Sequence, residues 1–471
     1  MRRWRIAIAF VALVAVAAYV YFFEIKGGEE KQKQKEASEK VLAFQTDQIT
    51  AIVLTRPAGS VRLEKSGGTW KIQEPLPAAT DSEAVERLLT SLQSMRISHE
   101  LGSQVDLSPY NLQNPPLSLQ LTAQGGKPLP SLLVGDDSPT GGGAYARLGR
   151  DGQIVIVSGV EPLRGATLFS LRDKTFFKFD PAKLAGFKLR SGKEELALRK
   201  QNGQWSLQSP ILAPAEDSTI SDLLSSLERL TVTEFVDEKP SPESLAKHGL
   251  VPPRVTVVLH AEEWKSDPEF SLGTADAGNL YALHPQTGAL VKVSDSIEAK
   301  VKSSPADLRR KELMPMQRWD LAGLRVTGAT PVALELKRKG EKEWDRISPD
   351  PGVLTDEPVD VLLRGLTDLK AEQFLDKPSP KLATYGLDPP RVKLEFHKQG
   401  EEGAAPTVLE VGRPDGHGKI YMKESPWPSV ALVDESIWKR ASEQIGQVTA
   451  EKPQPQAAAQ TQPGVAIPAK Q

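Results

Sequence analysis

The chain contains no cysteine, which excludes disulfide bonds, thiolate metal sites, cysteine nucleophiles and an acylated N-terminal cysteine. An excess of charge of one sign is also lacking. The 59 Lys and Arg residues of the chain nearly balance its 61 Asp and Glu residues, so the net charge is −2. Such a balance creates no field strong enough to favour nucleic acid. We therefore expect no nucleic-acid partner.

Histidine is scarce, and the histidine residues are not spaced as metal ligands would be. The six are His99, His248, His260, His284, His397 and His417. No two of them lie four residues apart on a helical segment, and there is no Gly-x-Ser-x-Gly motif. The glycine-rich segment 134–143 lacks the Lys-Ser/Thr pair of a phosphate loop. We expect no catalytic residue, no metal and no cofactor, and hence no enzyme.

One long apolar run, Ile6–Phe23, follows Arg2, Arg3 and Arg5 directly. About 20 apolar residues cross a bilayer, and the arginines predict a cytoplasmic N-terminus. We predict a single transmembrane anchor that contacts the lipid bilayer through residues 6–23, with the rest of the chain periplasmic or extracellular. Ala15-Val16-Ala17 keeps a cleaved signal peptide open as an alternative, although bulky aromatic residues continue beyond it.

A threefold repeat dominates the remaining sequence. Three strands are built around Trp70, Trp205 and Trp344, which lie 135 and 139 residues apart. An apolar stripe with helical spacing follows each: Val85, Leu88, Leu89, Leu92 and Met95; then Ile220, Leu223, Leu224, Leu227 and Leu230; then Val359, Leu362, Leu363, Leu366 and Leu369. This spacing predicts one principal helix in each copy, and Ser82, Asp217 and Asp356 are the expected N-caps.

A second repeated motif ends a short helical turn in each copy. It reads Tyr110-Asn111-Leu112, His248-Gly249-Leu250 and Tyr385-Gly386-Leu387, each followed within four residues by two prolines. Asn or Gly at this place suits a left-handed C-terminal cap, and the prolines favour an extended chain beyond it. Alternating strands follow, one of which carries Tyr145, Tyr281 or Tyr421. Short connections predict mainly antiparallel sheets in an α+β fold.

These patterns predict six segments along the chain. They are a cytoplasmic stub and anchor at 1–23, a polar stalk at 24–40, module 1 at 41–177, module 2 at 178–317, module 3 at 318–450 and a tail at 451–471 that is too poor in large apolar residues to pack. We expect the modules to stack into a semi-rigid rod, because their junctions are short.

The recurring aromatic residues allow two interpretations. Trp70, Trp205 and Trp344 recur at one position, as core residues do, but if exposed they would form a stripe of binding contacts together with Tyr145, Tyr281 and Tyr421. His248 stands where the other copies have tyrosine, so we expect it to fill an aromatic packing position. The basic cluster Arg309-Arg310-Lys311 is expected at a solvated surface, with contact to anionic lipid or a partner as the alternative.

The sequence resembles a bacterial family known as domain of unknown function 4340. The resemblance is carried by the expected N-terminal anchor, the tryptophan strand, the leucine helix and above all Tyr385-Gly386-Leu387-Asp388-Pro389-Pro390. The resemblance covers about Val41 to Ala450. It implies a single-pass envelope protein, in some members encoded beside ABC-type transport permeases, and it supplies no catalytic residues. Asn111 departs from the family pattern, which has glycine there.

The leading expectation is therefore a non-catalytic scaffold or accessory protein of the inner or cytoplasmic membrane that binds another envelope protein, with a transport permease as the candidate. A module that binds cell-wall glycan through stacked aromatic rings is the alternative. A third option is an envelope hydrolase with a carboxylate pair between modules.

Overall fold

The computed structural model describes residues 39–102, 106–139, 141–149, 152–314, 316–328, 333–340, 342–400 and 403–452. They form two compact units, one ending at Thr175 and the other beginning at Phe176. The predicted anchor, most of the predicted stalk and residues 453–471 lie outside the described residues. Among the residues that are described, no helix is long and apolar enough to cross a membrane.

Module 1 contains a nine-stranded antiparallel sheet with the strand order β4-β3-β2-β1-β6-β7-β8-β9-β5. Its strands are β1 (Ile49–Arg56), β2 (Gly59–Ser66), β3 (Thr69–Glu74), β4 (Ala78–Ala79), β5 (Arg96–Gly102), β6 (Leu117–Ala123), β7 (Leu132–Asp137), β8 (Ala144–Leu148) and β9 (Ile154–Ser158). Its helices are α3 (Ser82–Ser94), α4 (Glu161–Gly165) and α5 (Leu168–Leu171).

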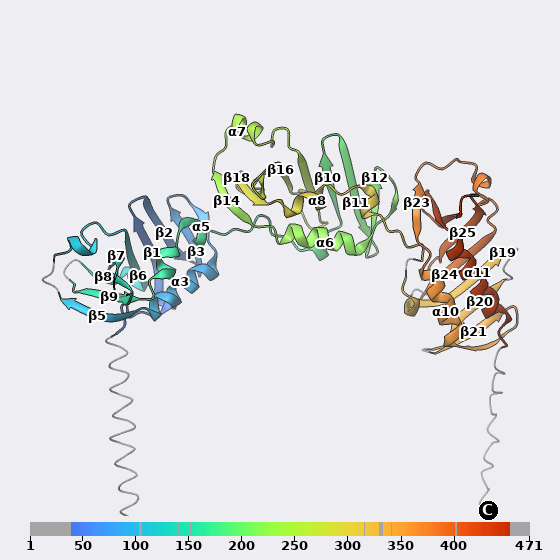
Figure 1. Cartoon of the computed structure of the whole chain (residues 1–471), viewed down its shortest axis with the longest axis horizontal. Helices are drawn as coiled ribbons and strands as arrows, with labels where there is room; N and C mark the ends of the chain where they lie inside the picture. The colour runs from blue at the N-terminus through green and yellow to red at the C-terminus, as the bar shows by residue number, and fades with distance from the viewer. Residues whose placement is uncertain are drawn as a thin grey trace, which may run out of the picture. The chain divides into compact units, whose positions relative to one another are not determined.

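Module 2 repeats this order as β13-β12-β11-β10-β15-β16-β17-β18-β14 (Figure 1). The strands are β10 (Gly186–Ser191), β11 (Glu194–Gln201), β12 (Gln204–Ser209), β13 (Ala213–Pro214), β14 (Val232–Asp237), β15 (Val255–His260), β16 (Glu269–Asp276), β17 (Asn279–Leu283) and β18 (Leu290–Ser294). The helices are α6 (Asp217–Glu228), α7 (Pro242–Lys247), α8 (Glu298–Val301) and α9 (Pro305–Leu308).

Module 3 repeats it once more as β22-β21-β20-β19-β24-β25-β26-β27-β23. The strands are β19 (Leu321–Gly328), β20 (Leu334–Arg338), β21 (Glu343–Ser348), β22 (Gly352–Thr355), β23 (Ala371–Leu375), β24 (Val392–Lys398), β25 (Thr407–Pro414), β26 (Lys419–Ser425) and β27 (Val430–Asp434). The helices are α10 (Asp356–Thr367) and α11 (Glu435–Ala450). The prediction of an α+β fold with mainly antiparallel sheets is thus confirmed, with one such sheet in each module.

The principal helix of each module connects the two edge strands of its sheet. In module 1, α3 follows edge strand β4 and precedes edge strand β5, so the chain crosses the sheet between its two edges. The predicted stripe supplies the buried side of α3, where Val85, Leu88, Leu89 and Leu92 lie in the core. The same holds for the stripes of α6 and α10. In each module this helix therefore packs on the apolar face of the sheet.

The N-cap prediction was wrong by one residue. The N-caps are Asp81, Glu216 and Thr355, and the predicted Ser82, Asp217 and Asp356 are the first residues of their helices. Asp217 and Asp356 act differently from caps, because each accepts a hydrogen bond from the tryptophan of its own module. The Trp205 backbone nitrogen donates to Asp217 at 3.2 Å, and Trp344 Nε1 donates to Asp356 at 3.1 Å.

Module 3 ends differently from the other two. Modules 1 and 2 finish in short helices, after which Arg172 and Arg309 bridge to Thr80 and Ala215 beside the edge strands β4 and β13. Module 3 instead ends in the 16-residue helix α11, which packs Trp438, Ala441, Ile445 and Val448 into its core. A terminal repeat with its own closing element is typical of repeat proteins.

Candidate functional site

The three recurring tryptophans lie inside the modules. Trp70, Trp205 and Trp344 are 2%, 6% and 0% exposed, and each belongs to the hydrophobic core of its module. The preceding strand places a cation near each ring: Lys65 at 5.6 Å, Lys200 at 5.8 Å and Arg338 at 4.3 Å from the ring centroid. Rings held in this way have no free face for a ligand. The geometry favours the core interpretation over the binding stripe.

The three tyrosines of the candidate binding surface are half-buried in aromatic pairs. Tyr145 packs on Tyr110 with ring centroids 4.5 Å apart, and Tyr421 packs on Tyr385 at 5.0 Å. In module 2 the partner of Tyr281 is His248, at 4.0 Å. The prediction that His248 fills an aromatic packing position is therefore confirmed. We call each pair an aromatic latch.

A glycine lets each latch lie close to the sheet. A Cβ added to Gly135, Gly273 or Gly412 would meet the main-chain oxygen of Tyr110, His248 or Tyr385 at 2.0, 2.1 and 2.1 Å. The turn itself ends on left-handed backbone at Asn111, Gly249 and Gly386, with φ of +55°, +69° and +68°. The predicted left-handed caps are confirmed, including the one at asparagine. This repeated motif serves to fasten a turn to the sheet.

The prediction of a solvated basic cluster at the end of module 2 was wrong for Arg309 and Arg310, whereas Lys311 is exposed. The Arg309 side chain is only 4% exposed, and its guanidinium lies 3.3 Å from the centroid of the Phe374 ring and pairs with Asp376. Arg310 Nη2 donates to both carboxylate oxygens of Glu424 at 2.6 Å. Both arginines thus bind residues of module 3, where apolar surroundings and acids replace water.

Burial disfavours the charged form of Glu424. Its side chain is 8% exposed, and this burial raises the pKa of the Glu424 carboxyl against the opposing pull of Arg310. Burial also disfavours the charged form of Arg309, and for a cation this means that the pKa of the guanidinium is lowered. The junction therefore contains buried ion pairs, in which loss of one partner would leave the other as an uncompensated buried charge.

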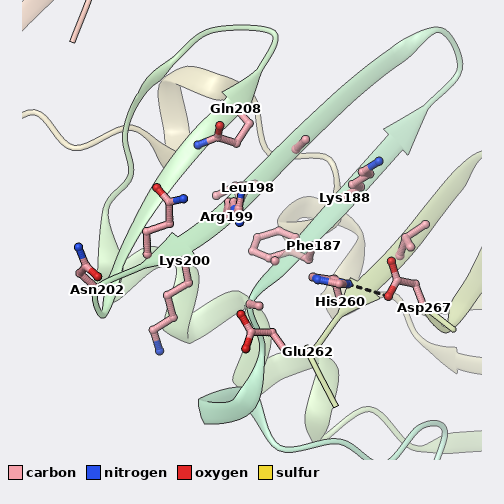
Figure 2. A pocket seen from close by; sticks show the side chains of 15 residues that line it. Phe187, Lys188, Leu198, Arg199, Lys200, Asn202, Gln208, His260, Glu262 and Asp267 are labelled. Carbon is pink, nitrogen blue, oxygen red and sulfur yellow. Dashed lines mark hydrogen bonds and ion pairs between the residues drawn. The ribbon is translucent and has the colours of Figure 1, made fainter. Parts of the chain in front are cut away.

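A polar hollow lies on the outer face of the module 2 sheet, opposite the core face that α6 covers. Figure 2 shows the side chains that line it. The hollow has a volume of about 670 Å³, and its lining includes Lys188 of β10, Arg199 of β11, Gln208 of β12 and His260 of β15. His260 Nδ1 lies 2.8 Å from Asp267 Oδ1 (Figure 2). The sequence reasoning missed this site, because no motif marks it and its residues come together only through the strand register.

Among the described residues there is no group of three or more His, Asp or Glu side chains that could hold a metal ion. Two pairs of acids that are adjacent in the sequence, Asp136-Asp137 and Glu262-Glu263, do not act together as acid/base pairs either. Asp137 binds Arg164 at 2.6 Å while Asp136 accepts from Asn111, and Glu263 binds Lys183 while Glu262 lines the hollow.

The geometry defines a class of protein: tandem copies of one α+β module whose repeated residues build cores and latches. A family model agrees with this. The model of the domain of unknown function DUF4340 matches residues 30–115, 70–239, 205–355 and 353–453. The chain belongs to the DUF4340 family. No curated protein matches the sequence.

Proposed function

We propose that this chain is a non-catalytic envelope protein, held in the inner or cytoplasmic membrane by residues 6–23, that serves as a scaffold or accessory subunit for other envelope proteins. An ABC-type transport system is the candidate assembly. The apolar run after Arg2, Arg3 and Arg5 supports the anchor and its orientation. The modules then lie on the periplasmic or extracellular side.

One observation carries the scaffold proposal: the modules share their interior and differ on their outer sheet faces. The tryptophans, helix stripes and aromatic latches recur in all three copies, where they pack against the chain itself. The outer strand positions vary in charge between the copies, as Arg62, Ala197 and Glu335 show at equivalent places on β2, β11 and β20. A fold repeated with varied outer faces suits recognition of several surfaces of a partner.

The glycan alternative receives no support from the six aromatic residues first considered for it. Stacking on a sugar needs an exposed ring face, and these rings are buried or paired. The hydrolase alternative needs two carboxylates that share a cleft. The buried acid Glu424 faces Arg310 instead. We therefore keep the scaffold as the leading proposal.

Crosslinking in intact cells followed by affinity purification tests the scaffold. The full chain, with a C-terminal tag, should recover a specific membrane or envelope protein. The matched control replaces residues 1–23 by a cleavable signal peptide, so that the modules are exported without an anchor. We expect recovery to depend on the anchor. Recovery of abundant contaminants alone from both versions would sink the proposal of a stable protein partner.

Protease treatment of spheroplasts tests the orientation separately. Protease added from outside should digest the modules. In spheroplasts without protease, the protein should stay in the membrane fraction after alkaline extraction. Release by alkali would contradict the anchor, and protection of the modules would contradict the orientation.

A further inference from the structure

The centre of the hollow on module 2 is formed by outward-facing positions on three neighbouring strands, and Gln208 of β12 adds to its lining. In the strand register, Gly186 of β10 lies between Arg199 of β11 and His260 of β15. Two residues further along β10, Lys188 lies between Ala197 and Val258. Alternate residues of a strand share a face, so these six positions form one patch.

Module 3 has the same patch with acids in it. There Gly323 lies between Lys337 and His397, and Arg325 lies between Glu335 and Glu395. Arg325 pairs with Glu335 at 2.8 Å and with Glu395 at 3.8 Å. Carboxylates on both neighbouring strands therefore neutralise Arg325, and at these positions two glutamates balance the charges of Arg325 and Lys337.

Module 2 keeps the cations and replaces both acids. Ala197 stands where module 3 has Glu335, and Val258 stands where it has Glu395. Within the described residues, neither Lys188 nor Arg199 forms an ion pair. The nearby acid Glu195 is engaged by Arg190 at 2.8 Å. At these six positions module 2 thus has two cations, Lys188 and Arg199, and no acid, whereas module 3 has two cations and two acids.

The equivalent positions of module 1 lack the excess of positive charge that module 2 has. In module 1 the equivalents of Lys188 and Val258 are Val53 and Gln120, neither of which is charged. The remaining charges, Arg62 and Glu64, pair with each other at 2.5 Å. Of the three copies, module 2 therefore has the outer patch with an excess of unpaired positive charge.

The same residues shape the hollow. Gly186 has no side chain, and a Cβ built on it would lie 2.9 Å from the Leu198 main-chain oxygen and 3.9 Å from the His260 Cβ. Ala197 is small, so the hollow lies between the longer side chains of Lys188, Arg199 and Gln208 (Figure 2). Its volume of about 670 Å³ falls in the range of small-molecule sites.

We infer that this hollow binds a sugar-sized polar anion, a saccharide that carries a carboxylate or a phosphate. Lys188 and Arg199 supply the positive charge for the anionic group, and guanidinium suits both oxyanions. The Gln208 amide and the His260–Asp267 pair are hydrogen-bonding groups for hydroxyls. Glu262 lines the hollow too and adds a negative charge to it. Since the cations are exposed to water, we expect a dissociation constant on the order of 1 mM.

Saturation-transfer NMR on the full detergent-extracted chain tests the site with four probes: glucuronic acid, glucose 6-phosphate, glucose and inorganic phosphate. We expect one or both charged sugars to bind at least tenfold more tightly than glucose. The stronger of the two identifies the anionic group. Phosphate alone binding as tightly as glucose 6-phosphate would overturn the saccharide part of the inference.

The decisive variant transfers the acids of module 3 into module 2. Ala197→Glu with Val258→Glu should weaken binding at least tenfold. It should not unfold the sheet, because module 3 carries glutamates at these positions. The reciprocal change, Glu335→Ala with Glu395→Val, should create a second site in module 3. Binding that survives the first pair of changes, or no binding of any probe to the unaltered chain, would overturn the site. Neither result depends on whether a protein partner is found.

Discussion

Arg346 donates from Nη1 to the main-chain oxygen of Val448 at 3.1 Å, which places a strand residue of module 3 at the end of the terminal helix α11. The same nitrogen donates to Thr449 and Glu451, and Nε donates to Asp350. Arg346 is 1% exposed and stands where modules 1 and 2 have the core residues Ile72 and Leu207. The last carbonyls of a helix lack partners within it, so this arginine caps α11.

Replacement of Arg346 by leucine tests this cap. Leucine is the residue of module 2 at this position, so its size suits the strand, but the carbonyls at the end of α11 lose their donor. We expect module 3 to lose about 2–4 kcal/mol of unfolding free energy. Hydrogen exchange should rise in α11 and remain unchanged in α6. Unchanged exchange in α11 would contradict the cap.

Gly412 tests the aromatic latch of module 3. Alanine there would bring its Cβ to 2.1 Å from the Tyr385 oxygen, so the turn or strand β25 must move. We expect a cost of about 1–3 kcal/mol in urea unfolding. The control is Gly446→Ala in α11, where nothing lies within 4 Å, and which should be neutral or gain about 0.5–1 kcal/mol. Equal effects of the two changes would argue against the latch.

The elements that the sequence predicted well are those with repeated local patterns. The apolar stripe of α3, for example, is buried as its spacing indicates, and the cap at Asn111 follows from local backbone chemistry. A pattern compared across three copies also removes chance matches. These predictions needed no knowledge of which strands are neighbours.

The features that were missed depend on pairing between distant residues. The expected solvated cluster failed because Arg310 meets Glu424, which lies 114 residues away. From the sequence alone, Arg346 would be expected at the surface, but it is buried because its partners lie at the end of α11. Its apolar neighbour Ile347, which would be expected in the core, is exposed. The hollow depends on whether Lys188 faces alanine or glutamate across the strands, and only the register decides that.

Trp344 distinguishes a core role from a binding role. Replacement by phenylalanine should remove the hydrogen bond to Asp356 and leave a gap in the core, costing about 1–3 kcal/mol. Trp319, which is 61% exposed, is the matched control, and Trp319→Phe should change stability little. Urea unfolding measures both. A Trp344→Phe variant as stable as its control would contradict the packing described here.

Glu424 predicts a pH dependence of the stability of module 3. Burial raises its pKa in the folded state above the ordinary value for glutamate of about 4.3. Its contribution to stability is therefore fully present below that ordinary value and is lost as pH rises through the raised folded-state pKa.

Glu424→Gln cannot titrate, so the stability of the unaltered chain minus that of the variant should fall as pH rises from 4 to 8. With Arg310→Met in both chains the fall should be steeper, because the favourable ion pair is gone. Urea midpoints measured across this range provide the test, and a difference that increases with pH would show that the ion pair with Arg310 outweighs burial.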